Sequence, residues 1–195
     1  MIKLKGYDEA GQLNLPAGGY VGRIVGARVG EFQDHTPALF VAADVVEGEF
    51  AEYFARETAK FKKSRPDVQW SSNGTLKIRL FADDAQNVHW QLKNFLEAVK
   101  AANANVKAND GDDFDEKTLC GKYIGLIVGL KESDKLKSDG TPYTNAYISY
   151  AVSVGEIESG DFKIPPVKKS KNAPQSEKPK SNVEPPTDDI EDPPF

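Results

Sequence analysis

Residues 20–32 read YVGRIVGARVGEF. Apolar and polar side chains interleave along this stretch, which is typical of a β-strand with one buried face. Gly22, Gly26 and Gly30 recur every four residues, and this spacing places all three on one face of a strand. Glycines inside a strand mark bulges, sharp coiling or close backbone approach. The stretch therefore predicts a long first strand that curls strongly, as a small closed barrel requires.

Further strands are predicted on the C-terminal side of this one. Residues 38–46 and 50–54 are typical of a second and a third strand. Residues 74–81 alternate cleanly, with Leu76, Ile78 and Leu80 on one face. Residues 121–130 and 141–154 form a hairpin across a loop whose turn is Ser138-Asp139-Gly140.

One principal helix is predicted between the fourth strand and the last hairpin. Apolar residues fall at helical spacing over residues 85–102, and Asp83-Asp84 can cap its start. We expect Trp90 at the rim of the core. The predicted class is mainly β with one principal α-helix, arranged as an OB-type five-stranded barrel with additions.

The composition changes after residue 164. Eight of the twelve prolines follow that point, together with Lys, Ser, Asn and Glu. Such a segment buries too little apolar surface to offset its conformational entropy. We expect a folded domain over residues 1–164 and a disordered linker with an acidic tip over residues 165–195.

Composition also limits the class of protein. No apolar run approaches the ~20 residues that span a bilayer, and no secretory signal is expected, so we expect a cytoplasmic protein without membrane association. The single cysteine, Cys120, excludes an internal disulfide framework. No convergent set of catalytic or metal-binding side chains stands at a motif spacing, so neither an enzyme nor a cofactor is predicted. The acidic residues at 110–116 are interpreted as a solvated loop.

Basic and aromatic residues alternate in three places. Residues 55–74 hold the densest such stretch, Lys77 and Arg79 lie on the outer face of a strand, and tyrosines recur along residues 141–154. Single-stranded nucleic acids are bound by stacking of bases on aromatic rings and by phosphate contacts with Lys and Arg. Because the net charge is −5, such a surface must be a local stripe. The candidate nucleic-acid-binding residues are Arg23, Arg28, Tyr53, Phe54, Lys60, Lys62, Lys63, Arg65, Lys77, Arg79, Tyr143 and Tyr147.

The last eight residues form the second candidate site. They are Asp188, Asp189, Ile190, Glu191, Asp192, Pro193, Pro194 and Phe195. An aromatic ring at the end of a solvated acidic tail buries nothing in its own fold, so we expect a partner with an apolar pocket and a basic rim.

Two resemblances point to the same class. The acidic tip ending in Pro194-Phe195 resembles the C-terminal tip of bacterial and phage single-stranded-DNA-binding proteins, although Glu191, Asp192 and Pro193 lengthen it. Over roughly residues 14–155, the Pro-Ala-Gly-Gly-Tyr-Val segment, the strand ending Asp-Val-Val-Glu-Gly-Glu-Phe and the pair Tyr53-Phe54 resemble a family of phage-encoded single-stranded-DNA binders.

These resemblances imply a protein that coats and protects single-stranded DNA without sequence preference. It would act in phage replication, recombination or repair, and its tip would recruit replication or recombination proteins. The exposed edges of a small barrel would allow a homodimer. Two alternatives remain open: a recombination or strand-annealing accessory protein, and a non-enzymatic virion or interaction protein built on a β-sandwich.

Overall fold

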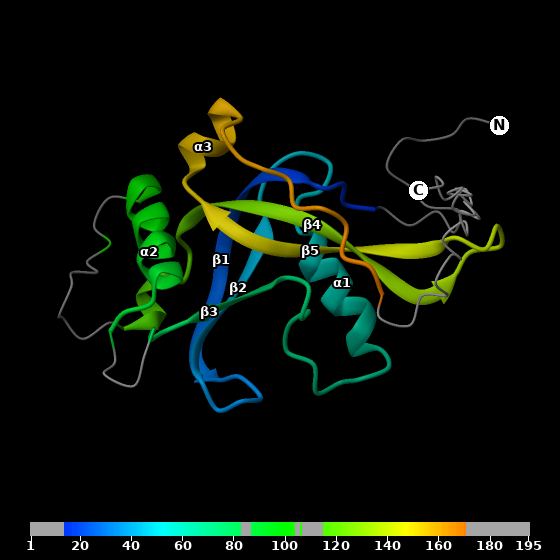
Figure 1. Ribbon diagram of the computed structural model, residues 1–195, viewed down its shortest axis with the longest axis horizontal. Helices are drawn as coiled ribbons and strands as arrows, with labels where there is room; N and C mark the ends of the chain where they lie inside the picture. The colour runs from blue at the N-terminus through cyan, green and yellow to red at the C-terminus, as the bar shows by residue number, and fades with distance from the viewer. Residues whose placement is uncertain (1–13, 83–86, 104–105, 107–114, 171–195) are drawn as a thin grey trace, which may run out of the picture.

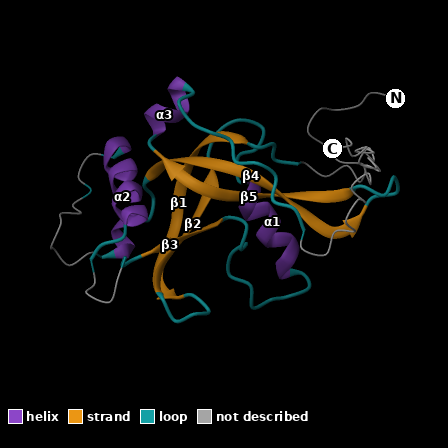
Figure 2. Cartoon of the chain, in the orientation of Figure 1, coloured by secondary structure: helices purple, strands orange, loops and turns teal. Residues whose placement is uncertain are grey.

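The computed structural model describes residues 14–82, 87–103, 106 and 115–170. The chain in these ranges is mainly β, with helices placed around one sheet (Figures 1 and 2). In chain order the elements are β1 (Gly18–Glu31), β2 (Pro37–Val45), α1 (Tyr53–Lys62), β3 (Thr75–Arg79), α2 (Trp90–Ala102), the 3-10 helix η1 (Glu116–Leu119), β4 (Tyr123–Leu136), β5 (Pro142–Val152) and α3 (Val154–Ser159).

The sheet has five strands in the order β3-β2-β1-β4-β5, and every neighbouring pair is antiparallel. The long strand β1 lies at the centre of the sheet. It pairs with β4 over residues 18–23 and with β2 over residues 22–31. The outermost strands also approach each other, because the Ile148 N–H of β5 donates to the Asn73 carbonyl just before β3 at 2.8 Å.

The core lies on one face of this sheet. Leu39 and Val41 of β2 and Leu76 and Ile78 of β3 are buried there, which confirms the alternation predicted over residues 74–81. The helix α2 covers this core, with Phe95 and its neighbours Leu92, Ala98 and Val99 all buried. Figure 1 shows α2 at the left of the sheet and α1 to the right of β1–β3.

The predicted strand at residues 50–54 is wrong. Residues 48–52 turn, and α1 begins at Tyr53. The carboxylate of Asp44, at the end of β2, accepts hydrogen bonds from the Phe54 and Ala55 N–H groups, both at 2.9 Å. These are two of the N–H groups that have no partner within a helix, so Asp44 acts as the cap of α1 from a neighbouring strand.

The predicted helix over residues 85–102 begins later than expected. Residues 87–89 run back along the end of β3, where Phe81 pairs with Val88. The Nδ1 atom of His89 then accepts from the Gln91 N–H and caps α2. The predicted caps Asp83 and Asp84 lie outside the described residues. Trp90 is 62% exposed on the first turn of α2, so its predicted place at the core rim is wrong.

Residues 161–170 follow α3 and lie along β4 and β5 as an extended segment, which we call the strap. Lys168 pairs in parallel with Lys131, through hydrogen bonds of its backbone to Leu130 and Glu132 at 2.9 and 2.8 Å. The hydroxyl of Tyr150 donates to the Lys163 carbonyl at 2.6 Å. Residues 165–170, predicted as the start of the linker, therefore make hydrogen bonds with the sheet, because β4 extends beyond β1 and leaves its edge available.

Candidate nucleic-acid interface

The face of β1, β2 and β3 opposite the core carries cross-strand rows of side chains. Arg28 of β1 lies opposite Phe40 of β2, which in turn lies opposite Lys77 of β3. The next row along the strands is made of small residues, Gly26, Ala42 and Thr75. The row on the other side of Phe40 contains Gly30, Ala38 and Arg79. We call this surface the outer face.

A β-bulge sets which residues of β1 reach the outer face. Ile24 pairs with Ala43, but Gly26 pairs with Ala42, so Val25 is an extra residue in β1. A bulge of this kind shifts the alternation of the strand by one residue. Arg23 before the bulge and Arg28 after it consequently both lie on the outer face, although their spacing would separate them in a regular strand. For the same reason Gly22 faces the core, and the prediction that Gly22, Gly26 and Gly30 share one face is wrong.

Aromatic rings and guanidinium groups pack against each other on the outer face. The Arg28 guanidinium lies 4.6 Å from the centre of the Phe40 ring, and Arg79 lies 5.6 Å from the centre of the Phe32 ring. The Phe32 and Phe40 rings are tilted toward each other at 6.1 Å. These contacts hold the cations in place by cation–π attraction. They also hold the planar guanidinium groups of Arg28 and Arg79 beside aromatic rings, and this arrangement suits the stacking of a flat ligand on either guanidinium group.

The charges of the outer face are mostly uncompensated. Among the described residues, no carboxylate pairs with Arg28 or Lys77, and Arg79 has one exposed ion pair with Asp34 at 3.8 Å. Hydrogen bonds from Thr36, together with the nearby Arg79, hold the pKa of the Asp34 carboxyl below its usual range. Exposed ion pairs of this kind contribute little to stability, so Arg79 can exchange this partner at small cost.

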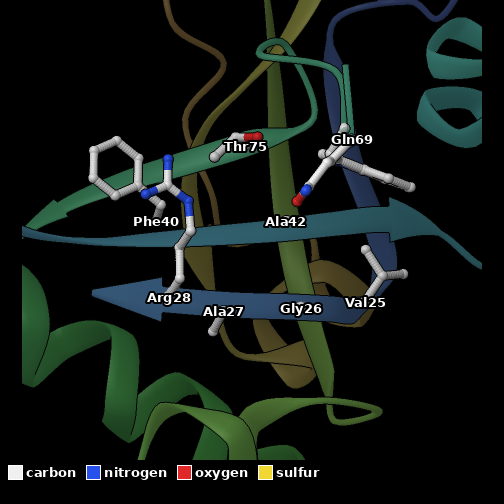
Figure 3. Close-up of a pocket in the computed structure, with 9 residues that line it drawn as sticks. Val25, Gly26, Ala27, Arg28, Phe40, Ala42, Gln69 and Thr75 are labelled. Atoms are coloured by element: carbon white, nitrogen blue, oxygen red, sulfur yellow. The ribbon is translucent and has the colours of Figure 1, made fainter. Parts of the chain in front are cut away.

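A groove of about 680 Å³ lies on the outer face. Figure 3 shows Arg28 and Phe40 at one end and Val25 and Gln69 at the other, above a floor that contains Ala42. The remaining lining residues are Gly26, Ala27, Trp70 and Thr75. Its volume lies in the range of roughly 300–1,000 Å³ that is usual for small-molecule and cofactor sites.

The loop between α1 and β3 forms one wall of the groove and is held in place by hydrogen bonds. The Trp70 Nε1–H donates to the Gly74 carbonyl at 2.9 Å. The Glu57 carboxylate of α1 accepts from the Asn73 amide at 3.0 Å and from the Ser71 hydroxyl. Because Asp44 caps α1 and Glu57 ties α1 to this loop, the position of the wall depends on both carboxylates.

The carboxyl group of Asp44 is buried, with 6% of the residue exposed. Burial raises its pKa above the ordinary value of 3.8, against the lowering effect of the hydrogen bonds from Phe54, Ala55 and Val45. A charged acceptor at the start of a helix is favourable, but burying it without a countercharge is costly. Asp44 therefore positions the groove wall through its hydrogen bonds to the start of α1.

The structure brings four of the predicted nucleic-acid-binding residues together on the outer face: Arg23, Arg28, Lys77 and Arg79. Of the basic residues on α1 and the following loop, Lys60, Lys62, Lys63 and Arg65 are exposed beside the groove wall rather than in its lining. Arg65 lies over the Phe61 ring at 5.5 Å.

The predicted aromatic residues do not line the groove. Phe54 has no exposed surface, so it cannot stack on a base and we leave it out of the interface. The ring of Tyr53 packs edge-on against Phe54 at 5.2 Å. On β5, Tyr147 is 8% exposed with Lys168 of the strap over its ring at 4.3 Å, and Tyr143 lies near Lys137. These tyrosines belong to a separate surface.

Sequence reasoning missed the aromatic residues that do line the groove or border it, namely Phe32, Phe40 and Trp70, and it missed Gln69. Phe40 lies within an apolar stretch, and its outward direction follows only once Leu39 and Val41 are known to face the core. Trp70 lies within the basic and aromatic stretch at residues 55–74, but its place beside Gly26 and Ala42 depends on the fold of the whole loop.

The tip residues 188–195 and the acidic residues 110–114 lie outside the described residues. In the part of the chain that is described, no group of three His, Cys, Asp or Glu side chains could hold a metal ion, and no helix is long and apolar enough to cross a membrane. The chain matches no model of a known protein family and no curated protein.

Proposed function

We propose that this protein binds single-stranded DNA along the outer face of β1–β2–β3, coating and protecting it during replication, recombination or repair in a phage-infected cell. The observation that carries the proposal is the groove itself, where Phe40 and Trp70 provide rings and Arg28 provides a cation without a carboxylate partner among the described residues. Aromatic stacking contributes ~1–3 kcal/mol per base and depends little on base identity.

The topology supports an OB-type barrel for this domain. β1 pairs with both β2 and β4, α2 lies between β3 and β4 in the chain, and the Ile148–Asn73 hydrogen bond links the two outermost strands. A five-stranded, partly open barrel with these connections binds nucleic acids across the face centred on its second and third strands. The outer face described above includes those strands. The resemblance of residues 14–155 to phage-encoded binders favours the same function.

The two tryptophans provide a direct test. Trp70 lines the groove, whereas Trp90 is exposed on α2. In Trp90→Phe the remaining signal comes from Trp70, and we expect oligo-dT to quench it on binding. In Trp70→Phe the remaining signal comes from Trp90, and we expect no quenching although binding is still detected by anisotropy of a labelled oligonucleotide.

The titration is repeated at several salt concentrations. Each phosphate contact on a single strand contributes about −0.7 to the slope of log affinity against log salt, so contacts from Arg28, Lys77 and Arg79 predict a slope of about −2 or steeper. Absence of binding at low salt would refute the proposed function. Quenching that appears only in Trp70→Phe would place the DNA on another surface.

We further propose that residues 188–195 recruit replication or recombination proteins. Their acidic side chains and terminal Phe195 support this, since a partner pocket would bury the ring and a basic rim would pair with the carboxylates. A synthetic peptide of these eight residues should compete with the full chain for such a partner, and a peptide ending in Phe195→Ala should not.

A further inference from the structure

The groove has a flat floor of small residues between two larger walls. Gly26, Ala42 and Thr75 form the floor, and a Cβ atom added at Gly26 would meet nothing within 4 Å. The walls carry the rings of Phe40 and Trp70. The space between them is therefore open in front of the sheet and suited to a flat, unsaturated group.

Gln69 provides the polar group of this space. It is exposed on the wall loop, and Figure 3 shows its amide directed over the floor toward Ala42. Within the described part of the chain, the amide makes no hydrogen bond. Its neighbour Trp70 is fixed by the hydrogen bond to Gly74, so the amide projects from an anchored position with its donor and acceptor both free.

We infer that the groove seats one unstacked nucleobase and that the Gln69 side chain hydrogen-bonds the edge of that base; this inference rests on the proposed function. A base has two flat faces for the walls and a polar edge for the amide. The Watson–Crick edge of every base presents a donor next to an acceptor. An amide offers the same pair side by side, and a rotation of its terminal bond reverses their order. Gln69 therefore forms hydrogen bonds with whichever of the four bases occupies the groove and does not select among them.

The test compares Gln69→Ala with the wild type on oligo-dT and on a phosphodiester strand of the same length that lacks bases. Gln33→Ala, an exposed residue in the loop between β1 and β2 that does not line the groove, is the matched control. We expect Gln69→Ala to weaken oligo-dT binding about two- to tenfold, the range for loss of one hydrogen bond. The affinity for the strand without bases should not change, and Gln33→Ala should change neither.

The outcomes separate the two proposals. Wild-type protein that fails to bind oligo-dT would overturn the proposed function itself. If the wild type binds oligo-dT but Gln69→Ala weakens both strands equally, Gln69 contacts the backbone and not a base edge. If Gln69→Ala weakens neither, Gln69 does not contact the strand. Either result refutes the inference. Repeating the measurement with oligo-dC and oligo-dA tests tolerance, since a loss confined to one base would show that Gln69 selects that base.

Discussion

The cap of α1 by Asp44 leads to a prediction about stability that can be worked out from the hydrogen bonds. Asp44→Ala removes the acceptor for the N–H groups of Phe54, Ala55 and Val45, each bonded at 2.9 Å. A net hydrogen bond is worth about 1 kcal/mol, and a buried donor left without a partner costs ~1–3 kcal/mol. Relief from burying a carboxylate offsets part of this loss. We expect the free energy of unfolding to fall by about 2–4 kcal/mol.

Asp44→Asn should have a smaller effect. The Oδ1 atom of Asp44 accepts from Phe54 and Val45, and an asparagine oxygen can retain both of these bonds. Only the contact of Oδ2 with Ala55 is lost, because an NH₂ group would face another donor there. We therefore expect a loss of about 1–2 kcal/mol, and Asp44→Ala should be the less stable of the two variants.

Urea denaturation at neutral pH measures both losses. With a slope near 2 kcal/mol per molar, the midpoint of Asp44→Ala should fall by about 1–2 M. Asp161→Ala, an exposed aspartate at the start of the strap, is the control and should shift the midpoint very little. If Asp44→Ala were as stable as this control, the cap would not hold α1 and the account of the groove wall would be wrong.

The pH dependence tests the state of the Asp44 carboxyl. Its pKa is raised in the folded protein above 3.8, so the folded state holds this proton to higher pH than the unfolded state. The stabilisation that the protonated carboxyl provides is fully present below pH 3.8, the ordinary pKa of this group. It is lost as the pH rises through the pKa that the group has in the folded protein. The advantage of the wild type over Asp44→Asn should therefore shrink as pH rises from about 3.8, and an advantage that grew instead would mean that the charged cap is favoured.

Three further predictions concern the outer face and Tyr20. Gly26→Leu fills the open floor of the groove and should weaken oligo-dT binding roughly 5- to 150-fold, which corresponds to the loss of about one stacked base. The melting temperature should not change. The control Gly155→Leu, on α3, should leave oligo-dT binding unaltered. Lys77→Gln should make the salt slope less negative by about 0.7, and Lys93→Gln on α2 should leave it unchanged. Burial, followed by the charge of a nearby glutamate, raises the pKa of Tyr20 to about 12, so an ultraviolet titration of the folded protein should show an ionisation near pH 12 that Tyr20→Phe lacks. Stability should fall as pH rises between about 10 and 12, because the folded state holds this proton longer than the unfolded state. An unchanged ultraviolet titration in Tyr20→Phe would contradict this.

The parts of the fold that repeat along the chain were predictable. The alternation of Leu76 and Ile78 with Lys77 and Arg79 correctly assigned both faces of β3, because period two leaves no other arrangement for a half-buried strand. The apolar spacing that includes Phe95 likewise located α2. In each case the signal lies within one element and needs no knowledge of its neighbours.

Features that depend on contacts between distant segments were not predictable. The pair Tyr53-Phe54 favours a strand by residue preference, yet it starts a helix because the Asp44 carboxylate accepts hydrogen bonds from the N–H groups of Phe54 and Ala55. No pattern in the sequence of β1 indicates the bulge at Val25, although the bulge determines that Arg28 faces outward. The groove combines β1, β2, β3 and the wall loop, so no single motif contains it.

The bulge also restricts how the length of β1 can vary. Each residue added to or removed from a strand reverses the faces of all residues beyond that point. Val25 is the exception, because its loss would remove the bulge and leave Arg23 and Arg28 on the outer face of a regular strand. Loss of one paired residue of β1 would reverse every side chain beyond it, and loss of two would keep each side chain on its present face. Homologous chains that keep both the bulge and the outer face should therefore differ in β1 length by even numbers of residues, and a chain that keeps the outer face with an odd difference should have lost the bulge or gained a second one.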